Sequence, residues 1–287
     1  MSYFDYKKHK IYYTEHGNGT PTLLLHGNTV SSDMFAPIIP LLSEKYHVIA
    51  LDFLGCGHSE HITEWSADLW YEWAKQVKAL CDHKGYEKVN IIGSSGGALA
   101  AINAALEYPE LINAIAADSF EGIRANMEIT EQIRTGRELA KHNEGFCAML
   151  KAIHGDDWER VFDADTDAVI RHAQNIGEFF HRPLSELQCK LLLTGSTEDE
   201  MFPHGHYEEL FHDICEQTPL AQACIFDHGS HPAMLSNTAE FAELCMQFFQ
   251  TANWDIEDAV PYSAVPASPC SSVYHRNDSC FSTREVS

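Results

Sequence analysis

The sequence has 287 residues, of which 45% are hydrophobic, enough to bury the core of one large domain. Its 19 Lys and Arg face 42 Asp and Glu, and a net charge of −23 argues against nucleic acid or an anionic membrane as partner. No apolar run reaches 18 residues and the start lacks a secretory signal, so we expect a cytoplasmic protein. The nine cysteines form no CxxC pair, which favours reduced thiols.

Strands and helices alternate along the first 120 residues. Strands are predicted at 10–17, 21–27, 46–53, 88–95 and 111–120, and helices at 66–84 and 96–108. Continuous apolar runs such as TLLL and VIAL are typical of parallel strands that helices cover on both faces. The pattern predicts an α/β fold with a mostly parallel central sheet flanked by helices.

Between residues 121 and 186 the strand pattern stops and the sequence reads as helical throughout. A helical stretch of this length is too long for an ordinary crossover, so we interpret it as an inserted cap. Crossover helices that merely cover the sheet are the alternative. Strands resume at 189–195 and 222–229, and a helix is predicted at 238–251.

The expected organisation therefore has three parts. They are a core of residues 1–120 and 187–254, a helical cap of residues 121–186, and a C-terminal tail of residues 255–287. The tail is rich in Ser and Pro and has little periodicity, so we expect it to be flexible and without a catalytic role.

Residues 93–97 read GSSGG and hold the pattern GxSxG in one frame only, with Ser95 at its centre. For Ser94 the pattern would need a glycine at the position of Ile92. An apolar strand enters this turn and a helix leaves it, so only small neighbours such as Gly93 and Gly97 fit and the hydroxyl is exposed. Ser95 is the predicted nucleophile. A Gly/Ser-rich turn without chemistry, or one that binds a phosphate, is the alternative.

A serine nucleophile needs a base, and the base needs a third group to orient it. With this kind of turn the acid comes next in the chain and the histidine last, both on loops after later strands. The strand KLLLTG leads to Asp199, the favoured acid, with Glu198 as the reserve. The strand ACIFD leads to His228 and His231, and His231 is the predicted base because it lies deeper in its loop.

An oxyanion site needs two backbone N–H donors that point at one position. Gly96 follows the nucleophile at a helix start and supplies the first donor. In LLLHGN, Gly27 lets the backbone turn close to the substrate, which leaves the N–H of Asn28 as the second. A plain turn is the alternative for this segment.

Three histidines, His204, His206 and His212, lie in the segment PHGHYEELFH. They lack a matching ligand set with a catalytic spacing, so we interpret the segment as an exposed helix start. We expect neither a metal ion nor a cofactor.

Five motifs, LLLHGN, DFLGCGHS, GSSGG, TGSTEDEMFP and HGSHPAML, resemble those of the α/β-hydrolase fold family in order and spacing. The resemblance covers residues 3–254, and the helical insert stands where that family has its cap domain. It implies the roles given above: Ser95 as nucleophile, Asp199 as acid, His231 as base, and Asn28 and Gly96 as oxyanion donors.

The sequence departs from the family pattern at the acid. The family's acid usually follows the glycine at the strand end by three residues, whereas Gly195 precedes Asp199 by four, so Glu198 stays a candidate. In addition, HGN resembles the halide-binding loop of haloalkane dehalogenases. Those relatives carry Asp at the position of Ser95, which argues against dehalogenation.

The expected activity is that of a carboxylesterase-like hydrolase, which cleaves a small to medium carboxylic ester through an acyl-enzyme. Met, Phe and Trp in the cap favour a substrate with an apolar part, unless they only pack the cap onto the core. The alternatives on the same fold are a C–C bond hydrolase, an acyltransferase and a ligand receptor without turnover. The negative charge disfavours an acyl-CoA thioester, and self-association into a homo-oligomer is left open.

Overall fold

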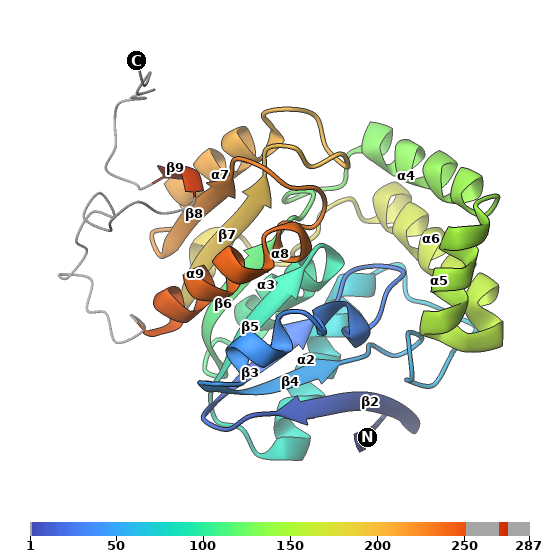
Figure 1. The fold of residues 1–287 in the computed structure, drawn as a ribbon, viewed down its shortest axis with the longest axis horizontal. Helices are drawn as coiled ribbons and strands as arrows, with labels where there is room; N and C mark the ends of the chain where they lie inside the picture. The colour runs from blue at the N-terminus through green and yellow to red at the C-terminus, as the bar shows by residue number, and fades with distance from the viewer. Residues whose placement is uncertain (1, 251–269, 275–287) are drawn as a thin grey trace.

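The structure, a computed structural model, describes residues 2–250 and 270–274. One sheet runs through the molecule with strands in the order β1-β2-β4-β3-β5-β6-β7-β8-β9 (Figure 1). Strands β3 to β8 pair in parallel, whereas β1, β2 and β9 join through antiparallel pairs. The strands are β1 Ser2–Tyr6, β2 His9–His16, β3 Thr20–Leu25, β4 Tyr46–Leu51, β5 Val89–Ser94, β6 Ile112–Asp118, β7 Lys190–Ser196, β8 Ala221–Phe226 and β9 Cys270–Tyr274.

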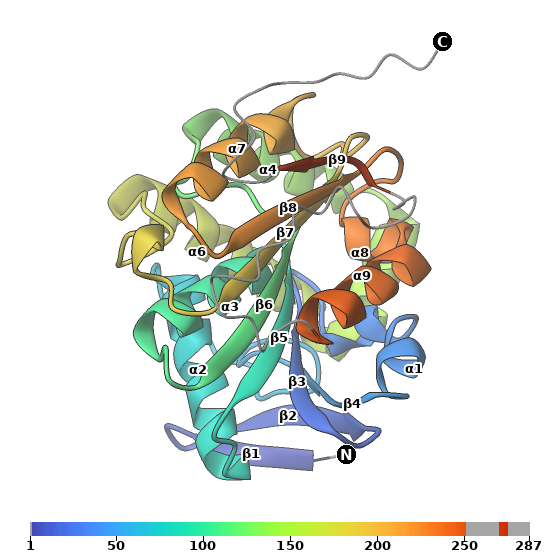
Figure 2. The ribbon, with the colours of Figure 1, turned by 90° about the vertical axis from the view of Figure 1, so that its left-hand side faces the viewer.

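Helices cover both faces of the sheet (Figure 2). Those packed on it are α1 Ile39–Leu42, α2 Leu69–Lys84, α3 Gly96–Glu107, α7 His206–Gln217, α8 Ala233–Ser236 and α9 Thr238–Gln250. Successive strand residues point to opposite faces, so Leu23 enters one core cluster with Trp73 of α2, and Leu24 enters the other with Phe241 of α9. This double burial explains why the parallel strands are apolar along their whole length.

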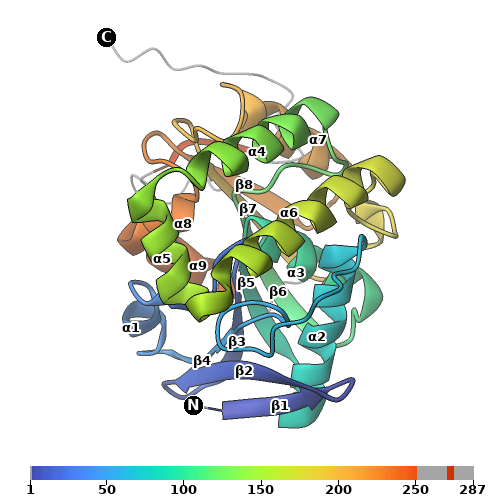
Figure 3. The same ribbon diagram turned by 90° about the vertical axis from the view of Figure 1, so that its right-hand side faces the viewer.

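Three helices, α4 Met127–Ala140, α5 Glu144–His154 and α6 Trp158–Asn175, lie within the segment expected to form the cap. Figure 3 shows them together on one side of the molecule. The side chains of Asn126 and Asn143 cap the first turns of α4 and α5 by accepting backbone N–H bonds. The residues of α6 that are buried recur at helical spacing: Val161, Phe162, Asp165, Thr166, Ala168, Val169 and His172.

The predicted α/β fold with a mostly parallel sheet is confirmed. Neither β1 nor β9 was predicted from the sequence. Strand β9 lies in the expected tail, whose other residues, 255–269 and 275–287, are outside the described part of the chain. The exposed helix start expected around His206 is the beginning of α7, but Tyr207 and Phe211 of this helix are buried.

The described cysteines are mostly reduced. Free thiols are found at Cys56, Cys81, Cys147, Cys189, Cys215 and Cys245. Cys224 on β8 is disulfide-bonded, so the expectation of reduced cysteines is wrong at this position. Among the described residues, no helix has both the length and the apolar character needed to cross a membrane.

Candidate active site

The turn between β5 and α3 separates the two adjacent serines. Ser94 ends β5 fully buried, and its hydroxyl donates to the Asp118 carboxylate at 3.2 Å. Ser95 occupies the turn itself, partly exposed, with φ 55° and ψ −122°. Residues other than glycine rarely adopt this conformation, which costs on the order of 1–3 kcal/mol and is typical of functional sites. A strained residue between a strand and a helix start is the geometry expected of a nucleophile turn.

Glycines at positions 93 and 97 permit the turn. A Cβ atom on Gly93 would lie 2.3 Å from the carbonyl oxygen of Gly97, and one on Gly97 would lie 2.0 Å from the carbonyl oxygen of Leu25. Because backbone atoms leave no room for a side chain, larger residues here would displace α3 and Ser95 with it.

The loop that follows β3 lies against this turn. A Cβ atom on Gly27 would be 3.0 Å from Cβ of Ser95, and one on Gly96 would be 2.1 Å from Oδ1 of Asn28. None of the described hydrogen bonds uses the backbone N–H of Asn28 or of Gly96. Gly96 is the first residue of α3, where N–H groups have no acceptor within the helix. Two N–H groups beside Ser95 are therefore available to a ligand oxygen.

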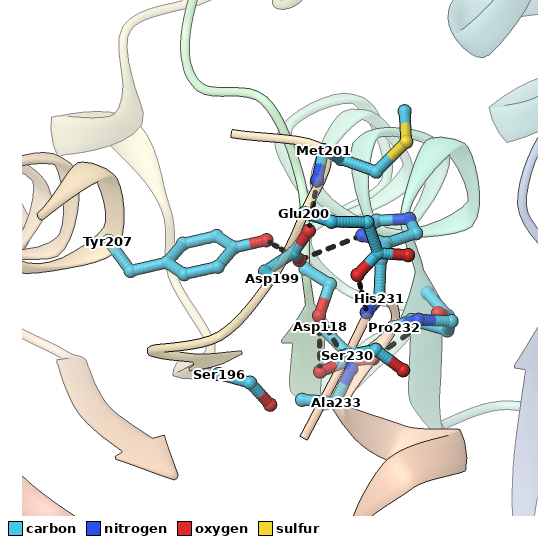
Figure 4. A network of polar contacts seen from close by, with 12 residues as sticks. Asp118, Ser196, Asp199, Glu200, Met201, Tyr207, Ser230, His231, Pro232 and Ala233 are labelled. Atoms are coloured by element: carbon cyan, nitrogen blue, oxygen red, sulfur yellow. Dashed lines mark hydrogen bonds and ion pairs between the residues drawn. The ribbon is translucent and has the colours of Figure 1, made fainter. Parts of the chain in front are cut away.

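Asp199 and His231 form a hydrogen-bonded pair on the loops after β7 and β8. Nδ1 of His231 lies 2.8 Å from Oδ2 of Asp199, and the two side chains are 15% and 2% exposed. Asp199 also accepts bonds from the Tyr207 hydroxyl at 2.6 Å and from the backbone N–H of Met201 at 2.9 Å (Figure 4). Burial alone would raise the pKa of Asp199, but the bonds from His231, Tyr207 and Met201 lower it overall.

The competing residues of both loops point elsewhere. Glu198 is exposed, and its carboxylate accepts the backbone N–H of Gly229 at 3.3 Å. His228 is also exposed, and its ring pairs with Asp227 at 2.7 Å. The structure therefore places Asp199, rather than Glu198, against the side chain of His231.

Ser95 and His231 are connected through β6 rather than directly. Among the described residues, no hydrogen bond joins the Ser95 hydroxyl to the His231 ring, and in structures without substrate this bond is often long. Instead, the backbone N–H of Ser95 donates to the carbonyl oxygen of Asp118 at 2.7 Å. The Asp118 carboxylate in turn accepts the backbone N–H of Met234, three residues after His231, at 3.1 Å. Asp118 was not among the predicted site residues, although a charged residue at the end of an apolar strand is a usable signal.

Side chains of the predicted cap hold the loop after β3. Oδ2 of Asp165, on α6, accepts bonds from Asn28 Nδ2 at 2.8 Å and from the Thr29 N–H at 3.3 Å. Its other oxygen pairs with Arg137 of α4 at 2.7 Å. The indole N–H of Trp70 donates to Asn28 Oδ1 at 3.1 Å. Both polar groups of the Asn28 side chain are thus used for anchoring.

His154, the last residue of α5, makes a second contact between cap and loop. Its Nε2 lies 3.0 Å from the carbonyl oxygen of Thr29, and its Nδ1 accepts the backbone N–H of Gly57 at 3.0 Å. The ring is buried, and burial lowers its pKa. Neither His154 nor Asp165 was predicted, because the segments they hold, at Asn28 and Gly57, lie more than 90 residues away in the sequence.

Within the described residues, no group of three or more His, Cys, Asp or Glu side chains is arranged to hold a metal ion. The site consists of a strained serine at a strand-to-helix turn, a hydrogen-bonded Asp–His pair with a buried carboxylate, and two available N–H groups. These parts lie on the segments that follow the parallel strands β3, β5, β7 and β8.

The chain also matches a known family over part of its length. A family model described as alpha/beta hydrolase fold matches residues 20–140. The chain has the α/β-hydrolase fold, and the resemblance predicted from its motifs is confirmed.

Curated relatives span most of the chain. A 2-hydroxy-6-oxo-6-(2'-aminophenyl)hexa-2,4-dienoic acid hydrolase of Metapseudomonas resinovorans is 24% identical over 82% of this chain and 86% of its own length. The human serine hydrolase BPHL is 27% identical over 84% of this chain and 83% of its own. Among solved structures, a thermophilic esterase from Thermogutta terrifontis matches with a TM-score of 0.65 and 20% identity, over 86% of this chain and 95% of that one. The three relatives named here are called hydrolases or an esterase.

Proposed function

We propose that the protein is a serine hydrolase in which Ser95 is the nucleophile, His231 the base and Asp199 the acid. The observation that carries this proposal is the 2.8 Å bond between the buried Asp199 and His231, on loops next to the sheet end where Ser95 stands. An ionised Asp199 holds the imidazole in the tautomer whose Nε2 is free to take a proton. The strained turn at Ser95 supports the same assignment.

The reaction is acyl transfer to water. His231 takes the hydroxyl proton as Oγ of Ser95 attacks the substrate carbonyl, and the resulting oxyanion accepts the N–H groups of Asn28 and Gly96. The tetrahedral intermediate then expels the alcohol, which leaves with the proton held by His231. A water molecule, deprotonated by His231, then attacks the acyl carbonyl. The bond to Oγ of Ser95 breaks as His231 returns the proton to this oxygen, which releases the carboxylic acid and restores the enzyme.

A small to medium, uncharged carboxylic ester is the substrate class we favour. Arg137, which shares Asp165 with the Asn28 side chain, is ion-paired with that carboxylate and bonded to Thr166, so its charge is neutralised within the fold. The net charge of −23 further disfavours polyanionic substrates.

A second candidate is hydrolysis of a C–C bond in a dienoate diketone, because relatives from Metapseudomonas resinovorans and Comamonas testosteroni carry such names. The same three residues would serve either reaction. Turnover of an aryl ester, set against turnover of a dienoate diketone under the same conditions, separates the two.

Replacement of the nucleophile tests the proposal. Ser95→Ala should lower kcat on the preferred substrate at least about a thousandfold, because the covalent step is lost. Ser94→Ala, one residue away, removes only a bond to Asp118 and should keep more than about a tenth of the activity. Substantial activity in Ser95→Ala would overturn the proposal.

A further inference from the structure

Asp118 lies outside the three residues of the proposed mechanism, yet it contacts the segments that carry two of them. We propose that Asp118 is a positioning residue, which together with Ser119 fixes the His231 loop relative to Ser95 and presents a second buried carboxylate to His231. This inference rests on the proposed function, since it assigns Asp118 a part in the same reaction.

Both oxygens of the Asp118 carboxylate accept hydrogen bonds. Oδ1 accepts the hydroxyls of Thr194 on β7 at 2.9 Å and Ser119 at 3.1 Å. Oδ2 accepts the hydroxyl of Ser94 on β5 at 3.2 Å and the backbone N–H of Met234 at 3.1 Å. The side chain is completely buried, so these bonds take the place of water. One carboxylate thus ties together two strands and the first turn of α8, which directly follows the loop of the proposed base.

Ser119 adds a second connection between the same segments. Its hydroxyl accepts the backbone N–H of Ala233 at 2.9 Å, and its own N–H donates to the carbonyl oxygen of Thr194 at 2.8 Å. Its φ of 52° is unusual for a residue with a side chain. Because the Asp118 carbonyl oxygen also accepts the N–H of Ser95, these two residues touch the nucleophile turn and the histidine loop at once.

Asp118 also acts on His231 through its charge, in addition to the hydrogen bonds described above. Burial raises the pKa of Asp118 to about 6. The hydrogen bonds to its carboxylate and the positive charge of a protonated His231 act in the opposite direction and limit this rise. The coupling is mutual, so an ionised Asp118 favours the imidazolium that forms when Ser95 gives up its proton. The other titratable groups that interact with Asp118 are Tyr207 of α7 and Cys245 of α9, and burial raises the pKa of both, which keeps them neutral.

Substitution of Asp118 by Asn separates charge from shape. The amide has the same size, and its oxygen can still accept the fixed N–H of Met234, while its NH2 group faces the hydroxyls of Thr194 and Ser119, which can rotate. The contacts then survive in part, whereas the negative charge is lost.

The test measures kcat and KM on the preferred substrate from pH 5 to pH 8, with thermal unfolding at each pH. We expect Asp118→Asn to lower kcat about ten- to one-hundredfold with KM within about threefold of wild type. Protonation of Asp118 should add to the fall of wild-type activity on the acidic side, which should therefore be steeper than one proton allows. In Asp118→Asn the acidic side of the pH profile should have the slope expected for a single proton.

The matched control is Asp52→Asn. Asp52 is also fully buried and accepts two backbone N–H groups, from Ser32 and His58, both at 2.7 Å, but it has no contact with the His231 loop. This variant should lose thermal stability while the shape of its pH profile stays that of wild type.

Unchanged kcat and an unchanged acidic limb in Asp118→Asn would overturn the inference. A lower kcat combined with an acidic side of the pH profile like that of wild type would also overturn it, because Asp118 would then have a structural role only. If Asp118→Asn does not fold, Ser119→Ala decides: kcat should fall at least about threefold at constant KM, and an unaltered kcat overturns the inference. Failure of the proposed function has a different signature, namely full activity in Ser95→Ala.

Discussion

At the scale of single residues, the two carboxylates after β7 have different surroundings. Asp199 is buried and bonded to His231 and Tyr207, while Glu198 is exposed and bonded to a backbone N–H. The extra residue between Gly195 and Asp199 is accommodated by a turn in which the N–H of Asp199 donates to the carbonyl oxygen of Ser196 at 3.3 Å. The spacing of this loop therefore does not require Glu198 to be the acid.

Separate substitutions of these two residues test the assignment of the acid. Asp199→Asn should lower kcat about a thousand- to ten-thousandfold, because the amide no longer holds the His231 tautomer. Glu198→Gln serves as the control and should stay within about threefold of wild type, since the side chain is exposed. Steady-state kinetics of both variants give the answer, and a larger loss in Glu198→Gln would reassign the acid.

Asp118 also predicts a pH dependence of stability. Its pKa in the folded protein, about 6, is above the ordinary value of 3.8, so the folded state binds this proton more tightly than the unfolded state. The stability it contributes is present below pH 3.8 and is lost as the pH rises through about 6. Between pH 4 and pH 7, the free energy of unfolding of Asp118→Asn should therefore rise relative to wild type, by up to about 3 kcal/mol. Denaturant unfolding at both pH values measures this difference, and a difference of opposite sign would contradict it.

At the scale of elements, the helices over the sheet end and the loop after β3 form one unit. Asp165 of α6 and His154 of α5 hold Asn28 and Thr29 from above, and Trp70 of α2 holds Asn28 from the core. The geometry of the proposed oxyanion loop thus depends on the packing of the predicted cap.

Removal of the Asp165 carboxylate tests this dependence. Asp165→Ala leaves Arg137 without its partner and Asn28 without its acceptor, so we expect a loss of about 3 kcal/mol in the free energy of unfolding and about tenfold in kcat. Asp167→Ala is the control on the same helix, because its pair with Arg171 is exposed and contributes little. Equal effects of the two substitutions on kcat would show that the cap does not support the loop.

At the scale of the whole molecule, local sequence patterns predicted the fold well. Apolar runs located β3 to β8, and the GSSGG turn located Ser95, because each of these features is set by neighbours in the chain. Strand β9 was missed because it depends on pairing with β8. The buried face of α7 was missed although Tyr207, Phe211 and Ile214 recur at helical spacing. The disulfide at Cys224 was also not predicted, because cysteine spacing alone does not fix pairing.

The residues of the site also fall into two groups, those that could be proposed from the sequence and those that could not. Ser95, Asp199 and His231 could be proposed from motif order, since each follows a recognisable strand. Asp118 and Asp165 could not, because their roles arise from hydrogen bonds to segments between 24 and 137 residues away along the chain. The residues of the proposed triad could thus be named from the sequence, whereas the residues that contact their loops required the tertiary structure.

The central claim is that Ser95 is an activated nucleophile, and covalent labelling with a fluorophosphonate probe tests it most directly. The phosphonyl adduct, mapped by tandem mass spectrometry, should sit on Ser95 and not on the adjacent Ser94, and it should disappear in Ser95→Ala and slow sharply in Asp199→Asn. An intact, folded protein that takes up no label at Ser95, or takes it up at Ser94 instead, would contradict the account.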